Sequence, residues 1–553
     1  MKLHQLSNAD EGPITVPTDA TGLAERRLFA RITKRRTSVA QSTVEQRSKR
    51  DRSPARKAVR TFGFRGLPGR GGGRWTLVDK PAEYRGTSNQ VCGIWPWLVS
   101  AGTPTIGTYL GENLDTGQAL CFDPLNWFHR ANLISNPSVF ILGLPGLGKS
   151  TLCRKMVTGA IASGVTPMIL GDLKGEYVDQ IHKMAGQVVK VGPGEGTINP
   201  LAVGALGSIL PILEAHGFEE EFKRVQAEVL SRQVEMTGAL IAMVRKDRPV
   251  SDTEEAVLSR ALELITSDVR FGPGTPPLLT DLREFLADGH PDLFATCESE
   301  THEQYLEVTR PLRMSLRALI DTPVGRVFSA QTSTPLDLDA PAVCVDVSAL
   351  ARGDSRLRAA VLLACWNDGF GAIEAAHTLS DLGLRPQRQF QAVLDELWQV
   401  LSAGPGMVER VDALTRINRT LGLSLMMITH TPKDLRTLKS EQERQRAMGF
   451  IERAGAVICG GLTPADIDAL ETVIAFTAKE RARVSGWSSP PTMDVQRNLE
   501  KPPPGRGMFL LKIGRRPGAA FVTKLTSTEI ASGIHNTNKR FDGLDRAARY
   551  EQT

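Results

Sequence analysis

Residues 143–150, Gly-Leu-Pro-Gly-Leu-Gly-Lys-Ser, have the spacing G-x-x-x-x-G-K-[ST] of a phosphate-binding loop. Glycines let a backbone wrap around a pyrophosphate, so that consecutive N–H groups and a helix N-terminus point at its charge. Lys149 is expected to reach the β- and γ-phosphates, and Ser150 to supply a hydroxyl to Mg²⁺. The motif therefore predicts that the chain binds ATP and Mg²⁺. The residues predicted to bind the nucleotide are Gly143, Leu144, Pro145, Gly146, Leu147, Gly148, Lys149, Ser150 and Thr151.

A phosphate loop needs a carboxylate at the end of another strand to orient the metal ion. Residues 390–394 form an apolar run that ends in Asp395 and Glu396. We expect Asp395 to bind Mg²⁺ together with Ser150. Glu396, one residue later, is predicted to activate the attacking water as general base.

Two other interpretations of the acids stay open from the sequence. An Asp-Glu pair at a strand end is also suited to capping the helix that follows it. Asp172 and Asp346 each lie at the end of an apolar run as well, so both are alternative metal ligands.

The elements that must position these residues are predicted from apolar runs. Residues 138–142 predict a buried strand before the phosphate loop, and residues 150–163 a helix after it. Strands alternating with helices are typical of an α/β fold whose mostly parallel sheet is covered on both faces. Two further runs near the C-terminal end predict a hairpin at the edge of the sheet. The other predicted strands are 165–172, 187–191, 342–347, 390–394, 424–428 and 456–459, and the hairpin is 508–513 with 520–524.

Lys149 and Asp395 are separated by 246 residues, too many for a minimal nucleotide domain. Residues 206–330 show helical spacing and almost no strand signal, above all at 219–244 and 252–267. They predict an all-helical insertion, which could be a lid, a docking surface or structural padding.

The predicted organisation starts with a disordered basic arm and a small β-rich lead-in. Between Arg26 and Arg74 there are sixteen Lys or Arg against Glu45 and Asp51, a net charge of +14, so the rest of the chain carries −8 of the total +6. Such an arm suits DNA or an anionic membrane surface, or it is a solvated tail. The predicted boundaries are 1–74 for the arm, 75–135 for the lead-in, 136–205 and 331–535 for the two parts of the ATPase core, 206–330 for the insertion and 536–553 for a loose tail.

The composition is that of an ordinary globular protein, with 41% hydrophobic and 23% charged residues. No apolar run is long enough to span a membrane, and the N-terminus lacks the apolar core of a secretion signal. The seven cysteines contain no C-x-x-C pair, which favours reduced buried thiols over a metal site or a disulfide framework. We therefore expect a cytoplasmic protein, or one bound peripherally at the inner face of the cell membrane.

The order of motifs along the chain resembles a known family. The phosphate loop is followed by Asp-Leu-Lys-Gly-Glu-Tyr at 172–177, by Asn-Pro-Leu at 199–201, by the helical region and by Leu-Asp-Glu-Leu-Trp at 394–398. This combination resembles the FtsK–HerA superfamily of pumping ATPases, and within it the main cytoplasmic ATPase of conjugative type IV secretion systems, in an actinobacterial form. The resemblance implies a RecA-like P-loop NTPase core, Mg²⁺-dependent ATP hydrolysis, a homo-hexamer and membrane channel proteins as partners.

The same resemblance implies further site residues. Members carry a polar sensor, usually Gln, after the strand that follows the Asp-Glu motif, and His430 stands at that position. Each site in such rings is completed by an arginine of the neighbouring subunit, for which Arg419 and then Arg416 are candidates, although both would also suit a solvated helix face. Arg506 matches a C-terminal glycine turn that related motors bring close to the nucleotide.

Two rival functions remain beside a secretion or conjugation motor. The long N-terminal domain typical of the secretion ATPases is missing, which leaves open whether the chain docks on the same membrane partners. The first alternative is a DNA-translocating ATPase of the FtsK or HerA kind, with the basic arm on the phosphate backbone. A nucleotide-gated binding module with little turnover is the second, and an intact Glu396 argues against it because such a module needs no base.

Overall fold

The computed structural model describes residues 103–245, 248–272, 274–322, 325–350, 354–402, 408–409, 411–412, 422–436, 438, 440–494, 499–501 and 503–535. The predictions for the basic arm at 1–74, for the tail at 536–553 and for Arg416 and Arg419 fall outside these residues.

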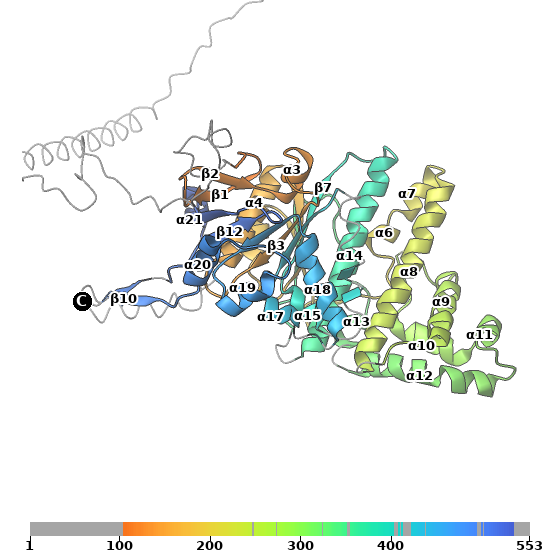
Figure 1. Cartoon of the computed structure of the whole chain (residues 1–553). Coiled ribbons are helices and arrows are strands. Elements are labelled where there is room, and N and C mark those ends of the chain that lie inside the picture. Colours follow the sequence, from red (N-terminus) through yellow and green to blue (C-terminus); the bar gives the residue numbers. More distant parts are fainter. Residues whose placement is uncertain are drawn as a thin grey trace, which may run out of the picture. The chain divides into compact units, whose positions relative to one another are not determined.

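The strands of the described chain build one large sheet and a separate ribbon (Figure 1). The large sheet has 11 strands in the order β2-β1-β13-β12-β9-β3-β8-β7-β4-β6-β5, and β10 pairs only with β11. The strands are β1 Thr108–Asn113, β2 Ala119–Phe122, β3 Ser138–Leu142, β4 Val165–Asp172, β5 Gln187–Lys190, β6 Val343–Asp346, β7 Gln389–Leu394, β8 Ser424–Ile428, β9 Ala456–Cys459, β10 Thr492–Asp494, β11 Leu499–Lys501, β12 Met508–Lys512 and β13 Ala519–Thr523.

The helices alternate with these strands and also form a long continuous series between β5 and β6. They are α3 Pro124–His129, α4 Lys149–Ala162, α5 Val178–Lys183, α6 Gly204–Gly207, α7 Leu210–Ala215, α8 Glu219–Val244, α9 Asp252–Thr266, α10 Leu279–Asp288, α11 Pro291–Thr296, α12 His302–Asp321, α13 Gly325–Phe328, α14 Ser355–Asp381, α15 Leu397–Leu401, α17 Pro432–Arg436, α18 Glu441–Arg453, α19 Pro464–Leu470, α20 Ala478–Gly486 and α21 Ser527–Ser532.

The central part of the sheet is parallel, from β9 through β3, β8, β7, β4 and β6 to β5. The predicted α/β class with a mostly parallel sheet is confirmed. Because side chains alternate along a strand, β3 sends Val139 and Ile141 into the core beneath α4, while Phe140 and Leu142 join the core on the opposite face, beneath α14. Helices therefore cover both faces, as parallel sheets require.

The remaining strands extend this sheet in antiparallel fashion. Strand β12 pairs with β9, β13 pairs with β12, and β1 joins β13 to β2. The predicted hairpin of β12 and β13 exists, but its placement at the sheet edge is wrong, because β1 and β2 cover its outer side. The strands in the predicted lead-in thus belong to the same sheet as the phosphate-loop strand.

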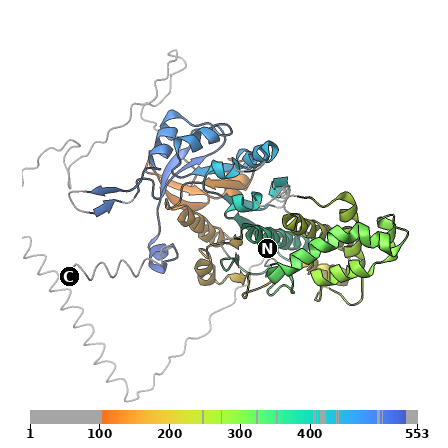
Figure 2. The same cartoon turned by 90° about the horizontal axis from the view of Figure 1, so that it is seen from below.

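Helices α6 to α13 form the predicted all-helical insertion. Figures 1 and 2 show α8 to α12, in yellow and green, grouped beside α14, and α8 contacts α14 directly. Helix α9 starts with a capping box, in which the Ser251 side chain and the Glu254 side chain each bond the other's backbone N–H. No helix in the described part of the chain combines the length and the apolar character needed to cross a bilayer.

Candidate nucleotide-binding site

Four neighbouring strands, β3, β8, β7 and β4, bring the predicted site residues together. The strands are parallel, so their carboxyl ends lie at one edge of the sheet. The phosphate loop follows β3, His430 follows β8, and Asp395 and Glu396 follow β7. The loop after β4 contributes Lys174. This edge of the sheet thus carries the phosphate loop, two acids and three side chains able to carry positive charge, which are Lys149, Lys174 and His430.

The phosphate loop adopts backbone angles that are accessible mainly to glycine. Gly146 and Gly148 have φ of +80° and +95°, a region that residues with a side chain rarely adopt. A Cβ on Gly143 would lie 3.3 Å from the Cα of Gly460, so this position is also crowded. Helix α4 begins at Lys149 with no side-chain cap, which leaves its first N–H groups available to an anion.

Two turns bond to the backbone of the phosphate loop, one at the C-terminal glycines and one after β9. The backbone N–H of Gly507 donates to the carbonyl of Leu147 at 2.9 Å, and the N–H of Leu144 donates to the carbonyl of Gly461 at 3.0 Å. Arg506 precedes Gly507 and is exposed. The structure therefore places the predicted glycine turn against the phosphate loop, with Arg506 beside it.

Lys149 is held at the centre of the site. Its Nζ donates to the carbonyl of Gly143 at 3.0 Å and to that of Thr429 at 2.9 Å, and it lies 2.7 Å from Nδ1 of His430. Burial lowers the pKa of Lys149, while the charge of Asp395 opposes this change. An ammonium group at this point is suited to binding a phosphate oxygen.

His430 links Lys149 to Glu396. Its Nδ1 faces the Lys149 ammonium, and its Nε2 lies 3.3 Å from Oε1 of Glu396. An ammonium has only donors and a carboxylate only acceptors, so a neutral ring with its proton on Nε2 satisfies both contacts. The residue at the predicted sensor position thus contacts both the lysine and the predicted base.

Glu396 is buried and surrounded by hydrogen-bond donors. Its Oε1 pairs with Nζ of Lys174 at 2.6 Å, and its Oε2 accepts from Nε1 of Trp398 at 2.7 Å. Burial alone would raise the pKa of Glu396, but the hydrogen bond from His430 and the charge of Lys174 hold it well below its usual range. Its backbone is left-handed, with φ of +52°, a strained conformation that is common at functional sites.

Asp395 has the properties expected of a metal ligand. Burial, followed by the negative charge of Glu396, raises the pKa of Asp395 to about 6. Its Oδ1 accepts from the backbone N–H of Glu396 at 2.9 Å. The hydroxyl of Ser150, at the start of α4, makes no hydrogen bond to any residue that the structure describes. A crowded carboxylate and a hydroxyl without a partner fit Mg²⁺, which takes most of its other ligands from water and phosphate.

The alternative metal ligands lie in other settings. Both carboxylate oxygens of Asp172 are used by its own loop, since Oδ1 accepts from the N–H of Lys174 at 3.2 Å and Oδ2 from that of Tyr177 at 2.7 Å. Asp346 is the last residue of β6, a strand farther from β3, and accepts from the N–H of Ser348 at 3.0 Å. Among the described residues there is no cluster of three or more His, Cys, Asp or Glu side chains suited to a metal ion.

Two residues that contact Glu396 have no role in the sequence-based predictions. Lys174 belongs to the motif at 172–177, and Trp398 lies two residues after the base. The signal for Lys174 was a charged side chain directly after a buried strand, the same signal that identified Asp395. Trp398 gives no such signal, because an aromatic residue at the start of a helix is usually core.

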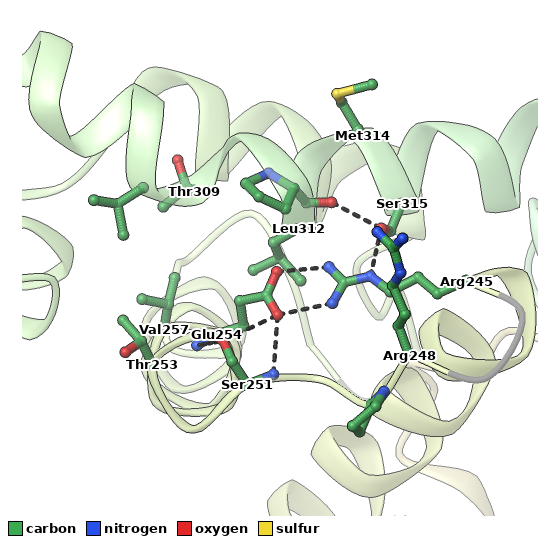
Figure 3. A pocket seen from close by; sticks show the side chains of 13 residues that line it. Arg245, Arg248, Ser251, Thr253, Glu254, Val257, Thr309, Leu312, Met314 and Ser315 are labelled. Carbon is green, nitrogen blue, oxygen red and sulfur yellow. Dashed lines mark hydrogen bonds and ion pairs between the residues drawn. The ribbon is translucent and has the colours of Figure 1, made fainter. Parts of the chain in front are cut away.

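A cavity of about 640 Å³ lies far along the helical insertion, between the end of α8, the start of α9 and α12 (Figure 3). Figure 3 shows Arg245 between Glu254 and Ser315. The guanidinium makes two bonds to Glu254, of 2.8 and 2.6 Å, and one of 2.8 Å to Ser315. Arg245, Glu254 and Ser315 thus bond to one another, and this cavity contains none of the predicted nucleotide-binding residues.

No protein-family model and no curated protein matches the chain, but solved structures are similar to it. VirB4 of Thermoanaerobacter pseudethanolicus matches with a TM-score of 0.54 and 18% identity, over 78% of this chain and 100% of that chain. The plasmid coupling protein TrwB in complex with ADPNP has a TM-score of 0.42 and 13% identity, over 77% of this chain and 96% of TrwB. The likeness to VirB4 shows a common fold and confirms the predicted RecA-like P-loop core.

Proposed function

We propose that the chain is an ATP-hydrolysing motor that energises a transport system of the conjugative, type IV secretion kind. The observation that supports ATP hydrolysis is the meeting of Lys149, His430 and Glu396 at the carboxyl edge of the sheet, directly beside Asp395 and an uncapped phosphate loop. Loop, lysine and paired acids are the parts that phosphoryl transfer to water requires.

Each residue has a distinct role in this proposal. The backbone of 143–148 and Lys149 bind the phosphates, and Glu396 orients and deprotonates the attacking water. Ser150 and Asp395 hold Mg²⁺, which when bound neutralises charge on the β- and γ-phosphates. His430 contacts Lys149 and Glu396 through its two ring nitrogens and so holds both side chains in position. Arg419, or else Arg416, is proposed to supply the cation of the neighbouring subunit.

The transport role rests on the fold and on the motifs together. VirB4, whose fold the chain shares, is a P-loop ATPase of the FtsK–HerA type. The loop at 172–177 and the Asn-Pro-Leu at 199–201 add a motif order that resembles the main ATPase of conjugative secretion. We therefore propose a homo-hexamer at the inner face of the membrane that acts with channel proteins. The basic arm at 1–74 is proposed to contact an anionic polymer or surface there.

The test is steady-state ATP hydrolysis by the full chain, with and without single- or double-stranded DNA. Glu396→Gln is the inactive reference, and Glu214→Gln, an exposed acid on α7, is the matched control. We expect Mg²⁺-dependent turnover that falls at least about 100-fold in Glu396→Gln, because the general base is lost, and stays unchanged in Glu214→Gln.

The DNA conditions separate the alternatives. Turnover that is indifferent to DNA supports a motor whose activator is a protein at the membrane. Strong stimulation by DNA favours the DNA-translocating ATPase instead. Turnover equal to that of Glu396→Gln under every condition would contradict a motor and leave a nucleotide-gated binding module.

A further inference from the structure

Lys174 forms a contact across the site that the proposed mechanism does not use. Its Nζ lies 2.6 Å from Oε1 of Glu396, although the two residues follow different strands, β4 and β7. The two side chains differ in exposure, since that of Lys174 is 49% exposed and that of Glu396 only 5%. The lysine is therefore the partner that solvent, or a ligand bound in the site, can reach.

Hydrogen bonds hold the backbone of Lys174, whereas its half-exposed side chain is held by its pair with Glu396. Asp172 accepts hydrogen bonds from the N–H groups of Lys174 and Tyr177, which holds the loop in a tight turn. Gly175 allows this turn with φ of +66°. A long, flexible side chain on a fixed backbone can exchange one acceptor for another without any movement of the loop.

Glu396 is short of free acceptor positions in the arrangement seen. Oε1 faces both Lys174 and His430, and Oε2 accepts from Trp398. A general base has to accept a hydrogen bond from the attacking water before it takes the proton. Trp398 is partly buried, and His430 is also engaged with Lys149. Lys174 is consequently the donor whose departure would open Oε1 to water.

A triphosphate bound at the loop would offer Lys174 a better acceptor. Burial is the main cause of the lowered pKa of Lys149, and the charge of Lys174 contributes to it, so the two ammonium groups share one electrostatic environment. A terminal phosphate next to Lys149 brings about two negative charges and three oxygens into that environment. A diphosphate ends one group earlier and lacks this acceptor.

We propose, on the basis of the proposed ATPase function, that Lys174 recognises the terminal phosphate of a nucleoside triphosphate. Its ammonium pairs with Glu396 as observed and moves to a γ-phosphate oxygen when ATP binds. This exchange frees Oε1 of Glu396 for the attacking water, so the base is released only when a triphosphate is in place. Lys174 thereby distinguishes ATP from ADP.

The test compares the affinities of ADP and of ADPNP, a non-hydrolysable ATP analogue, for the full chain in Mg²⁺. Lys174→Met is expected to weaken ADPNP about tenfold and to leave ADP unchanged, because one charge-assisted hydrogen bond to the third phosphate is lost. Lys174→Arg is expected to restore most of the difference. Glu396→Gln should tighten ADPNP, because Lys174 no longer leaves an ion pair, and the double variant Lys174→Met/Glu396→Gln should lose that gain.

Controls separate this inference from the proposed function. Lys149→Ala should weaken both nucleotides, and thermal midpoints of all variants report on folding. An equal ratio of ADP to ADPNP affinity in Lys174→Met and in the wild type would overturn the inference and leave the ATPase proposal intact. Absence of binding of either nucleotide to the wild type would overturn both.

Discussion

Nε2 of His430 lies 3.3 Å from Oε1 of Glu396, so the residue after β8 contacts the predicted base after β7. Strand β8 lies between β3 and β7, and His430 therefore stands between Lys149 and the acids. The histidine acts as both a donor and an acceptor in one row of polar groups.

This row predicts that glutamine can replace His430. A glutamine amide also has one donor side and one acceptor side, so His430→Gln should retain kcat for ATP hydrolysis within about threefold, whereas His430→Leu should lose about 10- to 100-fold through the missing bonds to charged groups. Steady-state kinetics of the two variants provides the measurement. Equal losses in both would show that the ring itself is required.

The raised pKa of Asp395 predicts that replacing its carboxyl group stabilises the folded protein at neutral pH. Since this pKa is raised from 3.8 to about 6, the folded protein binds the proton more tightly than the unfolded chain does. The stability that this proton contributes is present below pH 3.8 and is lost as the pH rises through about 6. In EDTA, Asp395→Asn should thus increase the free energy of unfolding at pH 7.5, by at most roughly 3 kcal/mol, and change it little at pH 4. Urea unfolding at both pH values checks this. A loss of stability at pH 7.5 would mean that the lysines stabilise the carboxylate more than burial opposes it.

Alanine substitutions at two glycines with positive φ distinguish the cost of backbone strain in stability from a loss of nucleotide binding. Gly148 and Gly164 have φ of +95° and +78°, but only Gly148 lies in the phosphate loop, and nothing lies within 4 Å of a Cβ at Gly164. Alanine at either position should cost about 1 kcal/mol of stability. Only Gly148→Ala should lose nucleotide binding, measured with a fluorescent ATP analogue. Wild-type binding by Gly148→Ala would remove the loop from the proposed site.

Mixed rings test whether Arg419 acts on the neighbouring subunit. Arg419→Ala and Glu396→Gln should each be inactive alone. A mixture contains sites in which one subunit supplies Glu396 and its neighbour supplies Arg419, so ATPase activity should reappear on mixing. Arg416→Ala is the comparison variant. Failure of every mixture, with ring assembly verified by mass, would assign the arginine to its own subunit or to no catalytic role.

A buried ion pair ties the C-terminal helix α21 to the phosphate-loop helix α4. Nζ of Lys155 lies 2.9 Å from Oε2 of Glu529, with side chains only 4% and 8% exposed. Lys155→Met should weaken the docking of α21 by about 1.5–3 kcal/mol, because Glu529 loses a charge-assisted hydrogen bond while it keeps those from Thr526. Limited proteolysis should then cut near 526–535. Lys190→Met, in an exposed pair with Glu195, should have no such effect.

Local features of the chain were predictable because they depend on short-range geometry. The strand, glycine loop and helix at 138–163 follow from residue spacing, and the predicted helix at 219–244 agrees with α8 at both ends. Asp395 and Glu396 were identified because two acids end an apolar run. The left-handed backbone of Glu396 was not predictable, since nothing in its neighbours requires it.

The position of the C-terminal hairpin within the sheet could not be predicted from the sequence. Two apolar runs on either side of the turn at 514–518 indicated that β12 and β13 pair with each other. The pattern does not say which strand lies outside them, because β1 precedes them by almost 400 residues and pairs through generic backbone bonds.

The phosphate loop, the acids, the α/β class and the helical insertion could be predicted from the sequence, because glycine spacing and the periods of strands and helices are local properties. The position of β8 between β3 and β7, and that of β4 beside β7, is seen only in the folded sheet. These neighbours bring His430 and Lys174 onto Glu396. Strand order depends on long crossover connections whose cost is repaid only by the packed sheet, so no window of the sequence contains it.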